Sequence, residues 1–158
     1  MTMAILRKDS VARTDAVSGY PDPYNQGSGQ LSYHALGDAG GLTQFGAAFE
    51  TLHPGGHSSQ MHWESHEDEF LYMLSGSITV IEDGEGTVIG PGDACCWKAG
   101  TPVAHTLKNH TAEPATYLIV GTRDPQNVTT YPGCDMLATP QGYTHVDGTP
   151  YPKKARTQ

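Results

Sequence analysis

The chain has 158 residues, enough for one domain whose hydrophobic core needs no disulfide or metal to hold it together. Its formal net charge of −8 argues against nucleic acid, whose phosphates require a basic surface, and against an anionic membrane surface. No apolar run is long enough to span a bilayer, so we expect no membrane insertion.

The first apolar stretch of the sequence is too short for a signal peptide. The three cysteines are an odd number, and Cys95 and Cys96 are adjacent, so no disulfide framework is expected. These features predict a protein of the reducing cytoplasm.

Residues 1–40 show no sustained hydrophobic period, and Pro21 and Pro23 interrupt them. We expect an extended N-terminal arm there, too irregular for a helix-turn-helix. Residues 41–122 are expected to form one barrel domain. Residues 123–158 are again rich in Pro and Gly with little period, which predicts a C-terminal arm packed on the barrel.

From residue 42 onward, short strand-like pieces alternate with turn residues. The expected strands are 42–52, 58–64, 69–74, Ile78–Glu82, Glu85–Ile89, 94–98, 103–107 and 117–120. Asp83-Gly84 is a strong signal for a two-residue hairpin turn. Turns spaced about 8–12 residues apart, with no credible helix between them, predict an all-β sandwich or barrel.

The strand expected at 69–74 is apolar on both faces. Leu71 and Met73 share one face with Glu69, and Phe70, Tyr72 and Leu74 share the other. We therefore expect this strand to be buried on both sides.

The stretch 56–69 is dense in imidazole and carboxylate side chains. His62 and Glu64 are two residues apart and would share one face of a strand, and Glu69 follows five residues later. Further on, His105 shares a strand face with Val103 and Leu107. Converging imidazoles and carboxylates are a donor set for a divalent metal ion, although a polar surface loop would explain the first stretch as well.

These residues resemble the two conserved motifs of the cupin superfamily. The positions that match are Gly56, His62, Glu64, Glu69 and Gly76 in the first motif, and Gly92, Gly100, His105 and Asn109 in the second. Glu64 replaces the second histidine of the first motif. Lys98 stands where the second motif usually has proline, and two extra residues lie between Gly100 and His105.

The sequence is similar, more closely, to a group of small stand-alone bacterial cupins. The similarity lies in Gly-Leu-Thr-Gln-Phe-Gly at 41–46, in His-Trp-x-x-x-Glu-Asp-Glu-Phe at 62–70 and in Thr-His-x-Asp-Gly-Thr-Pro-Tyr at 144–151. It implies a cupin jelly-roll β-barrel, also called a double-stranded β-helix, with extended arms at both ends.

The resemblance also implies one divalent metal ion held by His62, Glu64, Glu69 and His105. Two imidazoles and two carboxylates favour Mn²⁺ or Fe²⁺, and Zn²⁺ or Ni²⁺ remains compatible. His66, in the loop between Glu64 and Glu69, is the alternative as a substitute ligand or an acid/base. The sequence identifies no catalytic residue.

Cupins include isomerases, decarboxylases, dioxygenases, lyases and non-catalytic binders, so the fold does not fix the function. We expect a metal-dependent enzyme that polarises a small oxygen-bearing metabolite, such as a hydroxy or keto acid, a sugar or an enediol. The alternative is a small-molecule or metal-binding sensor without turnover. A homodimer is also expected, from the family resemblance and from the apolar outer face of strand 69–74.

Overall fold

The computed structural model describes residues 5–7, 9–25 and 30–152; the other parts of the two expected arms lie outside the described residues. The described chain is an all-β jelly-roll barrel with one four-residue helix, α1 (Leu36–Ala39), which confirms the predicted fold class. No helix in these ranges is long and apolar enough to cross a membrane.

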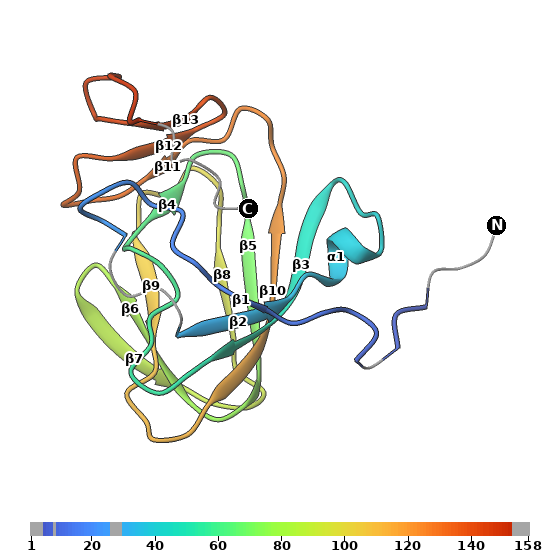
Figure 1. The fold of residues 1–158 in the computed structure, drawn as a ribbon. Coiled ribbons are helices and arrows are strands. Elements are labelled where there is room, and N and C mark those ends of the chain that lie inside the picture. Colours follow the sequence, from blue (N-terminus) through green and yellow to red (C-terminus); the bar gives the residue numbers. More distant parts are fainter. Residues whose placement is uncertain (1–4, 8, 26–29, 153–158) are drawn as a thin grey trace.

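The strands form three sheets (Figure 1). One sheet has six strands in the order β1-β2-β3-β10-β5-β8, a second has three in the order β7-β6-β9, and a third has four in the order β13-β12-β11-β4. In chain order the strands are β1 (Thr14–Asp15), β2 (Leu31–His34), β3 (Phe45–Leu52), β4 (Trp63–Glu64), β5 (Glu69–Ser75), β6 (Ile78–Glu82), β7 (Glu85–Ile89), β8 (Ala94–Trp97), β9 (His105–Lys108), β10 (Ala115–Thr122), β11 (Thr129–Thr130), β12 (Leu137–Thr139) and β13 (Gly142–Thr144).

The core lies between the six-stranded and three-stranded sheets. Alternate residues of each strand face inward, so that Leu71 and Met73 of β5 meet Ile78 and Val80 of β6. The other members of the buried cluster are Leu52, Leu107, Ala115 and Tyr117. Apolar side chains from both sheets fill the middle of the barrel. The polar residues that point inward therefore lie near the ends of the strands, and several of them form the site described below.

Two turns show why their residue types are needed. The β6–β7 hairpin turns at Asp83 and Gly84, with φ of 47° and 90°, as the Asp-Gly signal predicts. Gly76, which ends the first motif, has φ of 71°, and a Cβ atom there would lie 2.8 Å from Ala115 Cα. Any other residue at 76 would separate β5 from the turn before β10.

The predicted strands differ from the observed ones mainly at the ends of the chain. The segment 58–64 is regular only at β4, and before it His62 makes an isolated bridge with His105. The segments expected as arms contain strands that extend the sheets. β1 and β2 continue the six-stranded sheet beyond β3, and β11 pairs with β4 and is followed in the same sheet by β12 and β13.

The expectation that β5 is buried on both faces is wrong for the single chain. Its inward residues Leu71 and Met73 are fully buried, but Phe70, Tyr72 and Leu74 on the outer face are 38–44% exposed. Three large apolar side chains therefore form an exposed strip on the outside of the barrel.

Candidate metal centre

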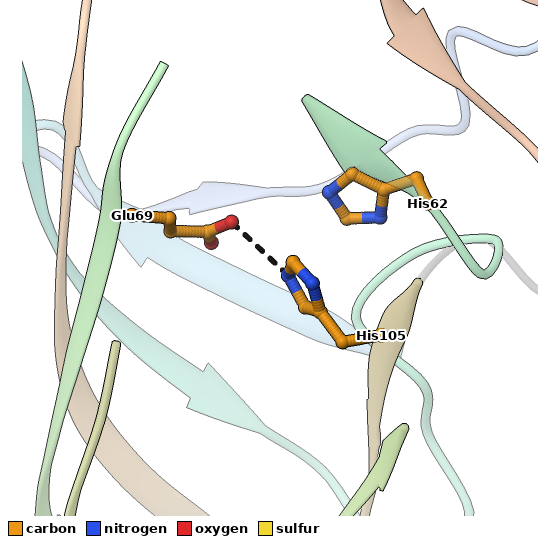
Figure 2. A group of neighbouring side chains, drawn as sticks. All are labelled: His62, Glu69 and His105. Carbon is orange, nitrogen blue, oxygen red and sulfur yellow. Dashed lines mark hydrogen bonds and ion pairs between the residues drawn. The ribbon is translucent and has the colours of Figure 1, made fainter. Parts of the chain in front are cut away.

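Three potential metal ligands, His62, Glu69 and His105, converge inside the barrel (Figure 2). One donor atom from each side chain lies within 4.8 Å of the others. The three residues come from separate segments, namely the bridge before β4, the start of β5 and the start of β9. We call them the His-Glu-His group.

Backbone pairing fixes the two histidines relative to each other. The His62 amide donates to the His105 carbonyl at 3.1 Å, and the His105 amide donates to the His62 carbonyl at 2.9 Å. This antiparallel bridge places the ring centroids 4.7 Å apart. Glu69 approaches from the six-stranded sheet, so that its position relative to the histidines depends on the packing of the barrel.

His105 is held firmly at the centre of the group. It is 4% exposed, and its Nε2 atom lies 3.1 Å from Glu69 Oε2. The Trp97 ring stacks on its imidazole at 3.9 Å with an interplanar angle of 8°, while Trp97 Nε1 donates to Glu82 Oε1 at 2.7 Å. The stacked indole limits rotation of the ring and shields one of its faces from water.

His62 is oriented by the backbone of the same loop. Its Nδ1 atom lies 2.9 Å from the Gln60 carbonyl oxygen, and because a carbonyl can only accept, Nδ1 carries the proton. The lone pair is then on Nε2, the nitrogen that would bind a metal. Burial, followed by the neighbouring His105, lowers the pKa of His62, which favours the neutral, ligating form.

Two residues of the N-terminal segment hold Gln60 in turn. The Gln60 amide donates to the Tyr20 hydroxyl at 3.3 Å, and the Gln60 side-chain amide donates to the Tyr24 carbonyl at 3.1 Å. Tyr131, 6% exposed, lies between this contact and the site, with its ring centroid 5.5 Å from Tyr20 and 5.9 Å from His62. The segment expected as an arm therefore supports a candidate ligand.

Glu64 does not belong to the His-Glu-His group. Between His62 and Glu64 the chain leaves its bridge with β9 and joins β11, so the two side chains do not share one regular strand. Glu64 Oε1 accepts a hydrogen bond from Thr129 Oγ1 at 3.4 Å. Burial, followed by repulsion from Glu67 and Glu69, raises the pKa of Glu64 to about 7.

The alternative ligand His66 also lies outside the group. Its side chain is exposed, and its Nδ1 atom lies 2.8 Å from the hydroxyl of the adjacent Ser65. This is the geometry of a histidine in a solvated loop.

A cavity of about 250 Å³ opens beside His105, and we call it the His105 cavity. Four carboxylates line it, from Glu64, Glu67, Glu69 and Glu82, together with Lys98. Glu69 and His105 belong to its wall, whereas His62 is not among the lining residues. Carboxylates crowded in a partly enclosed space favour a cation, because each one lowers the electrostatic cost of its binding.

Three residues of the site, Glu82, Glu67 and Gln60, were not predicted from the sequence. Glu82 had a signal, because it continues the inward alternation of Ile78 and Val80 to the end of β6, where it pairs with His105. Glu67 and Gln60 lie in loops without a period, so that their roles depend on tertiary contacts that a sequence pattern does not reveal.

Comparison with known proteins gives a consistent assignment. A sequence model of the cupin domain matches residues 48–121. A protein from Silicibacter pomeroyi, described as a sugar phosphate isomerase from a cupin superfamily, is 37% identical; the match covers 94% of this chain and 97% of that chain, with a TM-score of 0.86. No protein with a curated description matches.

Two further solved structures are more distant. One, from Acidithiobacillus ferrooxidans and proposed to be a sugar phosphate isomerase, is 29% identical, covers 74% of this chain and 76% of its own, and has a TM-score of 0.69. Another, from Thermotoga maritima and predicted to be an oxalate decarboxylase, is 21% identical over 75% of this chain and 98% of that chain, with a TM-score of 0.61. At that identity the likeness concerns the fold alone.

Proposed function

Because this chain belongs to the cupin superfamily, we propose that its His-Glu-His group binds one divalent metal ion and that the protein isomerises a small sugar phosphate. The observation that carries the metal site is the convergence of three donors from three separate segments. The substrate class comes from the description of the relative that is 37% identical over nearly the whole chain.

The spacing of the donors fits a metal ion. Two ligands about 2.1 Å from a metal and at right angles to each other lie about 3 Å apart. His105 Nε2 and Glu69 Oε2 lie 3.1 Å apart, and the orientation of His62 leaves its Nε2 lone pair available. Nitrogen and oxygen donors together suit Mn²⁺ or Fe²⁺ best, and Zn²⁺ or Ni²⁺ also fits.

In this proposal Glu64 is the carboxylate that moves the proton. When bound, the metal would act as a Lewis acid that polarises the substrate carbonyl. Glu64 lines the same cavity but lies outside the group of ligands, so it is free to take the proton from the carbon next to the carbonyl. Glu64, whose abstracted proton exchanges with solvent, then protonates the former carbonyl carbon while the hydroxyl proton moves to the other oxygen, and no oxidant is needed.

Lys98 is the cation proposed to hold the phosphate. It is the one lysine or arginine among the described residues that line the His105 cavity. Its ammonium group would offset part of the negative charge of the four carboxylates. The proline that cupins usually have at this position could not do so.

The test is a proton NMR assay in D₂O with a panel of aldose and ketose phosphates and protein loaded with Mn²⁺ or Fe²⁺. We expect conversion of at least one substrate, with deuterium incorporated next to the carbonyl. His105→Ala should abolish conversion, and His110→Ala, which changes an exposed histidine outside the group, should not. The absence of conversion across the panel, with metal bound, would exclude the isomerase and favour a binding or sensing protein.

A second candidate activity follows from the position of Glu64. Without Glu64 the donor set is two histidines and one carboxylate, which is typical of non-haem Fe²⁺ oxygenases. Consumption of O₂ by the Fe²⁺-loaded protein, in the presence of a substrate and without isomerisation, would support this activity instead.

A further inference from the structure

A second cavity, of about 400 Å³, lies on the inner face of the six-stranded sheet, and we call it the Glu50 cavity. It is bounded by β2, β3 and β10, which run side by side (Figure 1). Its lining includes Tyr33, Glu50, Glu67, Ile119 and Arg123. Glu67 also lines the His105 cavity, so a ligand that reaches past Glu67 would contact both.

Strand register places a carboxyl group among core residues. Glu50 shares a face of β3 with the fully buried Leu52, and it pairs with Tyr33 on β2 and with Tyr117 on β10. The neighbours of Glu50 on the two adjacent strands are thus tyrosines. The next inward-facing residues on these strands, toward the closed end of the barrel, are apolar.

One glycine of a cross-strand pair keeps part of the space open. Gly46 of β3 pairs with Gly121 of β10, and Gly121 pairs with Glu69 of β5. A Cβ atom at Gly121 would meet nothing closer than the Asp68 carbonyl oxygen at 3.7 Å, so the missing side chain leaves room rather than preventing a clash. The inner face of the sheet therefore has open space at Gly121, beside the candidate ligand Glu69, whereas the Arg123 guanidinium group covers Gly46.

Glu50 has no cationic partner among the described residues. The Tyr117 hydroxyl faces it and is itself fully buried, with no hydrogen bond within the usual limits. Burial, opposed in part by Tyr117 and increased by the charge of Glu69, raises the pKa of Glu50 to about 7. A carboxyl group without a cationic partner in a cavity is costly for a purely structural residue, and such groups cluster at binding sites.

We propose that the Glu50 cavity binds a neutral polyhydroxylated carbon chain, with the Glu50 carboxyl group accepting a hydrogen bond from a ligand hydroxyl. The inference deepens the proposed function, because the carbon chain of a sugar phosphate is such a ligand. It also stands apart from that function, because the cavity requires no metal.

The chemistry of the lining selects a hydroxylated ligand. Its carboxylates belong to Glu50, Glu67 and Asp38, and its one cation, Arg123, is already paired with Asp38. Because its one cation is already paired, this lining offers no free positive charge to a phosphate or carboxylate, whereas the His105 cavity offers Lys98. The lining also offers donors, such as the hydroxyls of Tyr33 and Thr122, which an ammonium group cannot satisfy because it accepts no hydrogen bond. A hydroxyl both donates and accepts.

The experiment is an NMR titration of metal-free protein with ribitol, followed through the backbone amides of Ala48, Glu50 and Ile119. We expect these amides to shift. Glu50→Leu should weaken binding about tenfold or more, since a hydrogen bond to a charged acceptor is lost, and Glu50→Gln, which keeps an acceptor, should weaken it less. Glu85→Gln, a change at an exposed position of β7 that lines neither cavity, is the matched control and should bind like the unaltered protein.

The proposal fails if ribitol shifts none of these amides, if Glu50→Leu binds it as well as the unaltered protein does, or if ethanolamine binds more tightly than ribitol. Because the titration uses metal-free protein, these outcomes do not depend on whether the protein is an isomerase. Ribitol binding without isomerisation would remove the proposed activity and leave the cavity assignment in place.

Discussion

Glu64 decides between two arrangements of the candidate centre, a group of three ligands with a separate carboxylate or a group of four. In the structure its carboxylate lines the His105 cavity but lies outside the His-Glu-His group. The expectation that it is the fourth ligand stays a prediction, and the proton-transfer role is the one the geometry favours.

A Glu64→Gln variant separates the two roles. If Glu64 transfers the proton, the variant should bind Mn²⁺ with unchanged affinity but lose isomerisation at least a hundredfold, because an amide cannot act as a base. Calorimetric titration with Mn²⁺ and the NMR assay are the measurements. If Mn²⁺ binding weakens tenfold or more, with Zn²⁺ binding less affected, Glu64 is a ligand and its proton-transfer role is wrong.

Glu50 should make the stability of the metal-free protein depend on pH. Burial, countered in part by Tyr117, raises its pKa from 4.5 to about 7, so between these values the folded chain holds a proton that the unfolded chain has lost. The free energy of unfolding therefore falls as the pH rises through this range, by up to about 3 kcal/mol.

Urea unfolding at pH 5 and pH 8 measures this effect. Glu64 titrates in the same range, so the comparison is between the unaltered protein and Glu50→Gln. The variant should be more stable than the unaltered protein at pH 8 and should gain little at pH 5. An equal difference at both pH values would show that Glu50 is ionised throughout.

At the scale of structural elements, the N-terminal segment is expected to support the metal centre through Gln60. Tyr20→Phe removes the hydroxyl that accepts from the Gln60 amide and should weaken metal affinity about tenfold, because groups that orient a ligand commonly contribute that much. Tyr143→Phe, from the same aromatic cluster, is the control. Titration with Co²⁺, followed by its visible absorption, gives both affinities. If Tyr20→Phe and Tyr143→Phe bind Co²⁺ with equal affinity, the N-terminal segment covers the barrel but does not orient a metal ligand.

The strands of the barrel could be predicted from the sequence because their apolar residues alternate and their turns carry Gly, Pro and Asp. β5, with inward Leu71 and Met73, and the Asp83-Gly84 hairpin are examples. β1, β2 and β11 to β13 could not be predicted, because they are two to four residues long and have no period of their own. Such strands form where an existing edge supplies partners, as β3 does for β2.

The candidate site shows the same limit. His62, Glu69 and His105 could be predicted from motif spacing, and the structure brings them together. The placement of Glu64 could not be predicted. It depends on the point at which the chain stops pairing with β9 and starts pairing with β11, whose residues are more than sixty positions away in the sequence. Periodicity describes one strand at a time and does not show which neighbour that strand will pair with.

At the scale of the whole molecule, the exposed strip of Phe70, Tyr72 and Leu74 predicts a homodimer. Such a strip on a strand in the middle of a sheet is more apolar surface than a monomer usually leaves in water. Light scattering at micromolar concentration should report twice the chain mass of 16.9 kDa. Tyr72→Glu should give the single-chain mass, and Val88→Glu, at an exposed position on β7, should not. A single-chain mass for the unaltered protein would contradict the prediction.

The metal content of the purified protein tests the central claim most directly. Elemental analysis after expression in medium supplemented with Mn, Fe, Co, Ni and Zn should find about one divalent metal ion per chain. His105→Ala should contain almost none, because it removes the most buried ligand, and His110→Ala should keep the full content. If the unaltered protein contains no metal, or if His105→Ala retains it in full, then His62, Glu69 and His105 do not form a metal centre.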